Sequence, residues 1–294
     1  PLMSGYACAI PGIMSTRTID SWKERLVTML VLPLISCSAR LPVYALMIGA
    51  FVPAVTVWKV FNLQGLTMVL MYFLGTATAM ILSLVFSRFI KADQKKSFIM
   101  ELPPYRIPVM QSVFRQVYMR GKLFVSGAGK IIMVVSIILW FLASFPYLDS
   151  DEHSIVDSYA AKIGHTIEPA IAPLGFDWKI GVGLITSFAA REVLVSTMAT
   201  IYNVEDEGDE LIKLTDALKN DMNPKTGRHV YSPLVALSLM IFYVYAAQCM
   251  ATFAIVRRET NSWKWPLFMI VYMTVLAYSA SFIVYQGGII LGYS

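Results

Sequence analysis

Several runs of apolar residues are about as long as a bilayer is thick, and this feature constrains the fold more than any other. The clearest runs cover 66–86, 124–145 and 265–285, and crossing the hydrocarbon core takes about 20 helical residues. Only 15% of the 294 residues are charged and 57% are hydrophobic, whereas a soluble domain carries about 25% charged residues. The sequence therefore predicts an all-α polytopic membrane protein.

Another apolar stretch, 26–57, is interrupted by the sequence SCSARLPVYAL at 36–46. This motif places Cys37 between two serines and puts Pro42 a few residues later. A proline inside a helix removes one backbone N–H and displaces the carbonyl four residues earlier, so Pro42 is expected to free the carbonyl of Ser38. Irregular backbone at membrane depth persists only where it is buried in protein or lines a wet cavity. The motif is therefore predicted to offer a thiol, hydroxyls and a carbonyl, which suit a partly dehydrated first-row divalent metal.

The chain has three cysteines, and all of them lie in interrupted or polar-flanked segments. Besides Cys37, Cys8 lies in the glycine- and proline-broken segment GYACAIPGIMSTR (5–17), and Cys249 follows Gln248 in an apolar run. An odd number of cysteines argues against a disulfide framework. The alternative to metal binding is that each free thiol acts as a small buried hydrophobe.

The apolar segments also contain charged residues: Arg40 in the motif above, and Arg191 with Glu192 at the centre of 178–202. Ionisable residues inside a membrane are functional candidates by default, although both arginines are also able to cap carbonyls or pair with acids. Arg191 and Glu192 are expected to be structural or gating residues, because a cation repels a metal ion. The predicted metal ligands are Cys8, Cys37 and Cys249, and the predicted pore or gate residues are Ser36, Ser38, Arg40, Arg191, Glu192 and Gln248.

Two apolar segments form an internal repeat. LVTMLVLPLISCSARLPVYALM (26–47) and LVALSLMIFYVYAAQCMATFAIV (234–256) both open with Leu-Val and carry a cysteine in the middle. Basic residues precede the first copy and follow the second, so the tendency of Lys and Arg to remain in the cytoplasm predicts that the copies run in opposite directions. Inverted repeats with interrupted or re-entrant helices are typical of transporters whose site lies near the bilayer midplane.

The loops between the apolar runs differ in charge. Eight Lys or Arg lie in 88–122, whereas 146–177 has one lysine and six acids, which places the first loop in the cytoplasm and the second outside. The basic link 257–264 then falls in the cytoplasm only if 178–202 re-enters the membrane or part of 146–177 dips into it, and we prefer the re-entrant arrangement. Apolar residues at helical spacing in 106–122 predict a helix on the membrane surface or a docking surface for a partner domain.

Three parts are predicted along the chain. Residues 1–100 form the first repeat and the following transmembrane helix, 101–122 form a cytoplasmic amphipathic linker, and 123–294 form a transmembrane helix, the second repeat and the C-terminal helices. No phosphate-binding loop, H-E-x-x-H motif or serine nucleophile elbow occurs in the sequence, so no enzymatic activity is predicted. The basic residues lie beside apolar segments, which argues against nucleic acid as a partner. The first residue is Pro1, so the chain is expected to be a piece of a longer polypeptide.

Six motifs follow one another along nearly the whole chain: GYACAIPGIMSTRTI (5–19), LPLISCSARLPVYAL (32–46), ELPPYRIP (101–108), PLGFDWKIGVGLITSFAAREVLVSTMATIY (173–202), QCMATFAIVRRETNSWKW (248–265) and IVYQ (283–286). Together they resemble the membrane domain of the ferrous iron transport protein B family. The resemblance implies a multi-pass protein of the bacterial inner membrane that imports Fe(II) through two Gate repeats, with Cys8, Cys37 and Cys249 as metal contacts. Ala7 departs from the family's usual glycine, and Gln248 from the proline that commonly precedes the cysteine.

The resemblance also implies cofactors and partners. Fe2+ is then the transported substrate, no cofactor is permanently bound, and GTP with Mg2+ binds in an N-terminal GTPase domain of the same protein. The further partners implied are the lipid bilayer, small accessory iron-transport proteins and other copies of the chain.

Two alternatives stay open at this stage. Gate repeats are similar to those of nucleoside carriers, so the substrate could be an organic solute, with Tyr243 and Tyr245 stacking on a base. In the other alternative, the chain only anchors, or senses for, a soluble GTPase that docks on the basic helix 106–122.

Overall fold

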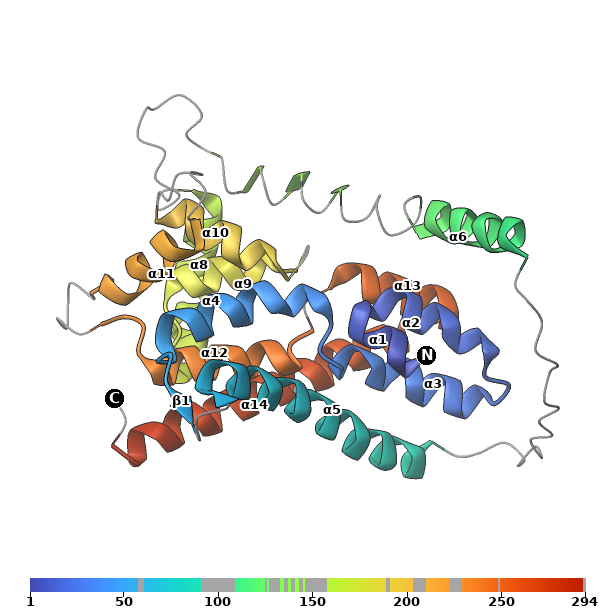
Figure 1. Cartoon of the computed structure of the whole chain (residues 1–294), viewed down its shortest axis with the longest axis horizontal. Coiled ribbons are helices and arrows are strands. Elements are labelled where there is room, and N and C mark those ends of the chain that lie inside the picture. Colours follow the sequence, from blue (N-terminus) through green and yellow to red (C-terminus); the bar gives the residue numbers. More distant parts are fainter. Residues whose placement is uncertain are drawn as a thin grey trace.

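A computed structural model describes residues 1–57, 61–90, 109–124, 158–188, 191–202, 210–222, 229–247 and 249–292, with a few single positions between 126 and 145 (Figure 1). Regular structure there is helical apart from one antiparallel ribbon, β1 (Thr56–Val57) with β2 (Phe61–Asn62). Four described stretches are long and apolar enough to cross a membrane: Trp22–Phe51, Leu63–Phe89, Pro233–Thr260 and Lys264–Ile290. The predicted all-α, multi-pass architecture is confirmed.

The chain begins with a short helical hairpin. Helix α1 (Leu2–Ala7) and helix α2 (Ala9–Ser15) are separated by Cys8, whose extended backbone (φ −157°, ψ 138°) ends one helix and precedes the next. The two helices approach closely because glycines face each other: a Cβ on Gly12 would lie 3.4 Å from the backbone nitrogen of Gly5. Cys8 therefore occupies the tip of this first hairpin.

The first interrupted helix begins after Ser21, whose hydroxyl accepts the N–H of the third helical residue, as a helix cap does. Its parts are α3 (Trp22–Val31), the 3-10 turns η2 (Leu32–Leu34) and η3 (Ser38–Arg40), and α4 (Leu41–Phe51). Pro33 and Pro42 each lie in the first turn of a helical segment, where a missing backbone N–H leaves no intrahelical bond unmade. The backbone between them is extended at Ile35 and Cys37, and we call residues 35–37 the first break.

Helix α5 (Leu63–Phe89) is an uninterrupted span, and α6 (Met110–Phe124) is a separate exposed helix. Along α5, large apolar side chains such as Val69, Phe73 and Leu84 are exposed, as expected for a helix that faces lipid. Helix α6 agrees with the predicted amphipathic segment, and whether lipid or a partner covers it stays a prediction. The predicted span 124–145 lies mostly outside the described residues.

A second helical hairpin consists of α9 (Trp178–Thr186) and α10 (Val193–Ile201). Its two ends meet, because Nζ of Lys179 lies 3.1 Å from the hydroxyl oxygen of Tyr202. Each helix has nine residues and is therefore about 13 Å long, which is too short to cross a bilayer. Segment 178–202 thus folds back on itself, which is the shape of a re-entrant segment.

Three further elements surround the second hairpin: α8 (Tyr159–Ile171), η6 (Ala172–Leu174) and α11 (Glu210–Asn220). The turn after η6 places Gly175 at φ 85°, and the ring of Tyr285 fills the space that a Cβ there would need. The side-chain amide of Gln286 donates to the carbonyl of Pro173 at 2.7 Å. The IVYQ motif therefore supports the entrance to the second hairpin.

The second interrupted helix consists of α12 (Pro233–Tyr245) and α13 (Met250–Thr260), and α14 (Lys264–Ile290) follows it. Residues 246–249 separate its two parts, and we call them the second break. Helix α14 packs along α12, and α5 packs along α3 and α12 (Figure 1). The chain order is therefore the same twice: a hairpin, an interrupted helix and a long uninterrupted span.

The two interrupted helices run in opposite directions (Figure 1). Arg25 near the start of α3 bonds to Glu259 near the end of α13, whereas the ring of Phe51 at the end of α4 lies 6.5 Å from that of Tyr231, before α12. We call the first end of the molecule the basic end, because it also carries Arg17, Lys23, Arg88, Arg257, Arg258 and Lys264. The end with Phe51 and Tyr231 is the opposite end. That the two units form an inverted repeat stays a prediction.

Candidate functional site

One cavity of about 220 Å³ lies where the two hairpin tips meet the two helix breaks. The three cysteines line it from three different elements: Cys8 from the tip of the first hairpin, Cys37 from the first break and Cys249 from the second. All three thiols are free and half-buried. The lining is otherwise mostly small and apolar, and its other polar or sulfur-bearing side chains are Ser38, Arg191, Glu192, Thr252 and Met273.

The first break is fastened to the first hairpin. The hydroxyl of Ser38 donates to the carbonyl of Ala7 at 2.9 Å. Because Ser38 follows Cys37 and Ala7 precedes Cys8, this bond holds the two thiols on neighbouring parts of the cavity wall. The structure thus brings Cys8, Cys37 and Ser38 to the cavity wall, and their roles as metal ligands and as a pore or gate residue stay predictions.

The second break is fastened to the second hairpin in the same manner but by other groups. Nη2 of Arg191 donates to the carbonyl of Ala246 at 3.1 Å, and the N–H of Met250 donates to the carbonyl of Phe188 at 3.2 Å. Arg191 is buried, with 6% of its surface exposed, and its Nη1 has no hydrogen-bond partner among the described residues. Glu192 lies on the cavity wall and is exposed, whereas Gln248 lies outside the described residues.

The buried side chain of Arg40 donates hydrogen bonds to backbone carbonyls that the first break leaves without helical partners. It is fully buried, and its guanidinium donates to the carbonyls of Pro33 (3.0 Å) and Leu34 (3.2 Å) and to the hydroxyl of Ser36 (3.2 Å). Neither Arg40 nor Ser36 belongs to the described lining of the cavity. Unpaired buried carbonyls are costly, so the guanidinium makes an irregular backbone tolerable at this depth.

The expectation that Pro42 frees the carbonyl of Ser38 was wrong. That carbonyl accepts the N–H of Leu41 in η3. Pro42 starts α4 instead of kinking a continuous helix, so its ring displaces no helical carbonyl. The carbonyls that the break does free are those of Pro33 and Leu34, and Arg40 takes both.

The cavity offers separate soft ligands and no preassembled metal centre. Within the described part of the chain, no three His, Cys, Asp or Glu side chains lie close enough to hold a metal ion together. Cysteine binds a metal as the thiolate, so a metal ion held by one of these cysteines would displace its thiol proton.

Two of the polar or sulfur-bearing lining residues were not predicted. Thr252 follows Cys249 by three positions on α13 and therefore lies on the same helix face, a spacing that could have identified it. Met273 is fully buried in α14 and brings a thioether to the cavity. It is one of 17 methionines, and its place depends on how α14 packs, which no local pattern reveals.

The tyrosines expected to stack on a nucleoside lie elsewhere. Tyr243 and Tyr245 are buried, and their hydroxyls bond to those of Ser187 (2.6 Å) and Thr78 (2.9 Å). Neither ring belongs to the described lining of the cavity.

Comparison of the sequence with known protein families identifies the family of this chain. The Gate profile, described as "Nucleoside recognition", matches residues 1–51 and 125–263, and the profile "Ferrous iron transport protein B C terminus" matches 68–120. The chain belongs to the ferrous iron transport protein B family. The second profile covers α5 and α6, the elements between the two Gate regions.

Relatives in this family align along essentially the whole chain. The Fe(2+) transporter FeoB of Leptospira biflexa is 45% identical over 100% of the chain, and that of Leptospira interrogans is 47% identical over 97%. A fusion of Fe(2+) transport protein A with FeoB from Porphyromonas gingivalis is 37% identical over 99%. The chain spans 43%, 42% and 37% of these three relatives. No solved structure matches.

Proposed function

We propose that the chain is the membrane-permeation part of a transporter that carries Fe2+ into bacterial cells. The observation that carries this proposal is the cavity to which three separate elements each contribute one cysteine. Sulfur ligands together with the hydroxyl oxygen of Thr252 suit a borderline divalent metal. Relatives that align along the whole chain are named Fe(2+) transporters, which supports iron over an organic solute. The activity proposed is transport, and no chemical reaction is assigned to the chain.

The path runs between two inverted Gate units. Each unit contributes one hairpin tip and one helix break to the cavity, and the two interrupted helices run antiparallel. In transporters of this kind the substrate site lies between the repeats near the bilayer midplane. The tips and breaks supply the irregular backbone that is tolerated at that depth only beside a cavity.

The protein lies in the inner membrane with its basic end on the cytoplasmic side. The Lys and Arg residues of the basic end belong to three separate regions of the sequence, 17–25, position 88 and 257–264, which together satisfy the positive-inside rule. Because 178–202 is a hairpin, the basic link 257–264 reaches the same end as Arg17 and Arg25. Iron therefore enters from the opposite end and leaves at the basic end.

Further partners follow from the relatives. They are more than twice as long as this chain, which leaves room in them for an N-terminal GTPase domain that binds GTP and Mg2+. The fusion relative joins Fe(2+) transport protein A to FeoB, which supports a small accessory protein as a partner. Fe2+ itself is cargo, and no permanently bound cofactor or nucleic acid is proposed. Assembly into a homo-oligomer is proposed on family resemblance alone.

Iron uptake into cells that lack other importers tests the proposal. We expect Cys37→Ser to reduce 55Fe(II) uptake strongly, because the hydroxyl that replaces the thiol binds the ion more weakly. Within the cavity, Met273→Leu is expected to alter uptake, whereas Met80→Leu on the exposed face of α5 serves as the matched control. Unchanged uptake in the Cys37→Ser variant would remove this residue from the mechanism.

The two alternatives predict other results. A nucleoside carrier would show uptake that nucleosides inhibit and that Mn(II) or Co(II) leaves unchanged. A membrane anchor or sensor would show no metal flux in liposomes, with or without a GTPase. Either result would overturn the proposal.

A further inference from the structure

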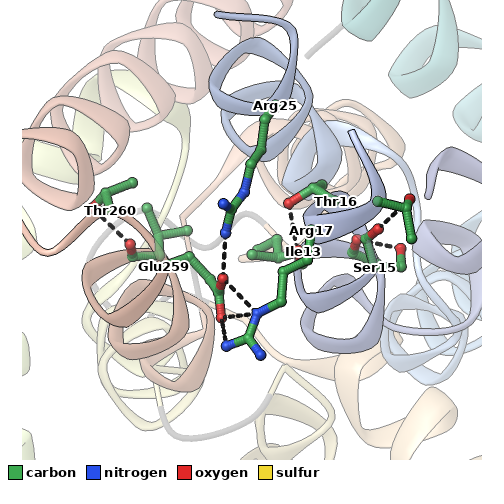
Figure 2. Close-up of polar contacts among 10 residues, drawn as sticks. Ile13, Ser15, Thr16, Arg17, Arg25, Glu259 and Thr260 are labelled. Atoms are coloured by element: carbon green, nitrogen blue, oxygen red, sulfur yellow. Dashed lines mark hydrogen bonds and ion pairs between the residues drawn. The ribbon is translucent and has the colours of Figure 1, made fainter. Parts of the chain in front are cut away.

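An ion-pair triad of Arg17, Arg25 and Glu259 lies at the basic end of the molecule, with the carboxylate of Glu259 at its buried centre (Figure 2). Glu259 accepts hydrogen bonds from Nε of Arg17 (2.9 and 3.1 Å), from Nη2 of Arg17 (2.6 Å) and from Nη2 of Arg25 (2.5 Å). Only 3% of the Glu259 side chain is exposed, against 54% for Arg17 and 21% for Arg25. One carboxylate thus joins two arginines from a different part of the chain.

Each member of this triad is connected to one cavity cysteine by a short stretch of chain. Cys8 precedes α2, and Arg17 follows it. Cys249 precedes α13, and Glu259 lies near the end of the same helix. Arg25 lies in α3, which leads through η2 to Cys37. The triad is therefore the place at which the three cysteine-bearing segments are joined a second time, away from the cavity.

The local structure fixes these positions. The hydroxyls of Ser15 and Thr16 donate to the carbonyls of Gly12 and Ile13 (2.7 and 2.6 Å) and close the end of α2 directly before Arg17 (Figure 2). On α13, Glu259 lies ten residues after Cys249, or about 15 Å along the helix. Short elements therefore connect the triad to the cavity.

The charges favour an intact triad. A carboxylate with almost no solvent contact needs its cationic partners, and removal of one partner leaves an uncompensated buried charge. Separation therefore requires that the arginines and the carboxylate regain water or other partners. Bidentate arginine–carboxylate contacts of this kind also fix orientation.

We propose that Glu259, with Arg17 and Arg25, forms the exit gate of the path, and that Glu259 is a positioning residue for the three cysteines. While the triad is intact, α2, α3 and α13 are held together below the cavity and the ion has no way to the basic end. Separation of Glu259 from the arginines lets α13 move away from α2 and α3 and opens the cavity to that side. The identity of the ion rests on the proposed function, but the gate does not.

Thiol accessibility tests the gate without any metal. The protein is expressed from its complete gene, and a membrane-impermeant maleimide is applied to vesicles of either orientation. We expect Glu259→Gln to raise the labelling rate of the cavity cysteines from the basic end by about tenfold or more, with no change from the opposite end. Glu24→Gln, an exposed carboxylate near the start of α3, is the matched control and should label like the unmodified protein.

A second variant guards against a folding defect. Arg17 is half exposed, so Arg17→Gln should fold and should raise labelling less than Glu259→Gln, because Arg25 still holds the carboxylate. Equal labelling of Glu259→Gln, Arg17→Gln and the Glu24→Gln control from the basic end would overturn the gate. Increased labelling in a protein that carries no Fe2+ would uphold the gate and defeat the proposed function, so the two failures are distinguishable.

Discussion

At both helix breaks beside the cavity, an arginine donates hydrogen bonds to backbone carbonyls, but the arginine comes from a different place in each case. In the first, Arg40 belongs to the interrupted helix itself, and its guanidinium takes the carbonyls of Pro33 and Leu34. In the second, Arg191 comes from the tip of the neighbouring hairpin and takes the carbonyl of Ala246. The first break is thus held by its own sequence, whereas the second depends on where a separate element lies.

This difference indicates which break is rigid. A break that carries its own donors keeps its shape when neighbouring helices shift. The second break loses its donor when the hairpin withdraws, so we expect it to change most when the cavity opens. It also belongs to α12–α13, the interrupted helix that ends at the gate residue Glu259. Three substitutions test the comparison, from the largest expected loss of stability to the smallest, and a fourth tests the cap of the second hairpin.

Arg40→Met should have the largest effect on folding. It leaves two buried carbonyls and the buried Ser36 hydroxyl without the donor that now serves them, a loss of about 3 kcal/mol or more. We expect little folded protein, measured as the monodisperse fraction after detergent extraction. Arg88→Met, on the exposed end of α5, is the control and should extract normally; equal yields would show that the first break does not need its arginine.

Arg191→Gln should cost less, about 1 to 2 kcal/mol, because a single hydrogen bond to a carbonyl is lost. The effect should be local: maleimide labelling of Cys249 rises, while labelling of Cys37 stays the same. Mass spectrometry of the labelled peptides measures both rates in one sample. A destabilisation as large as that of Arg40→Met would contradict the comparison between the two breaks.

Ser38→Ala removes the bond that fastens the first break to the first hairpin. We expect a loss of about 1 kcal/mol in stability and faster labelling of Cys8, read as a lower midpoint of thermal unfolding and by the same peptide assay. Ser87→Ala, at the exposed end of α5, is the matched control. If Cys8 labelling does not change, the bond from Ser38 to Ala7 does not hold the hairpin tip.

Asp177→Asn differs from the other three substitutions, because its effect should be stabilising and should depend on pH. Burial raises the pKa of Asp177 to about 6, against the opposing influence of the Ile180 N–H and of Lys179. The stability that the uncharged carboxyl contributes is present below its ordinary pKa of about 4 and is lost as the pH rises through 6. The asparagine keeps the cap on α9 and should stabilise the protein at pH 7.5, because no charge is then buried at this position.

Thermal unfolding at two pH values measures this last effect. The gain from Asp177→Asn should disappear at about pH 4, where the carboxyl of the unmodified protein is uncharged. Asp216→Asn on the exposed face of α11 should show no such dependence. A gain of the same size at both pH values would show that desolvation of the charge at Asp177 is not the cause.

Much of the fold could be predicted from local pattern. The long apolar runs became α5 and α14, and Arg191 with Glu192 in the middle of 178–202 indicated a segment that turns back. The role of proline at the first break could not be read correctly, because Pro42 is equally suited to kinking a helix and to starting one. Cys249 directly precedes α13 although no proline comes before it. Contacts with the second hairpin hold the chain on either side of Cys249: Arg191 donates to the carbonyl of Ala246, and Met250 donates to that of Phe188.

The sequence by itself determined that the chain is a membrane protein, where its helices are interrupted and which residues bring sulfur and charge into the bilayer, because apolar length and proline position act locally along the chain. Only the tertiary structure decided that Arg40 turns inward to backbone carbonyls and that Arg191 donates to another element. It also decided that Met273 lines the same cavity as the three cysteines, and that Glu259 contacts two arginines more than 230 residues earlier in the chain. Those contacts depend on the packing of distant segments, which a local pattern does not encode.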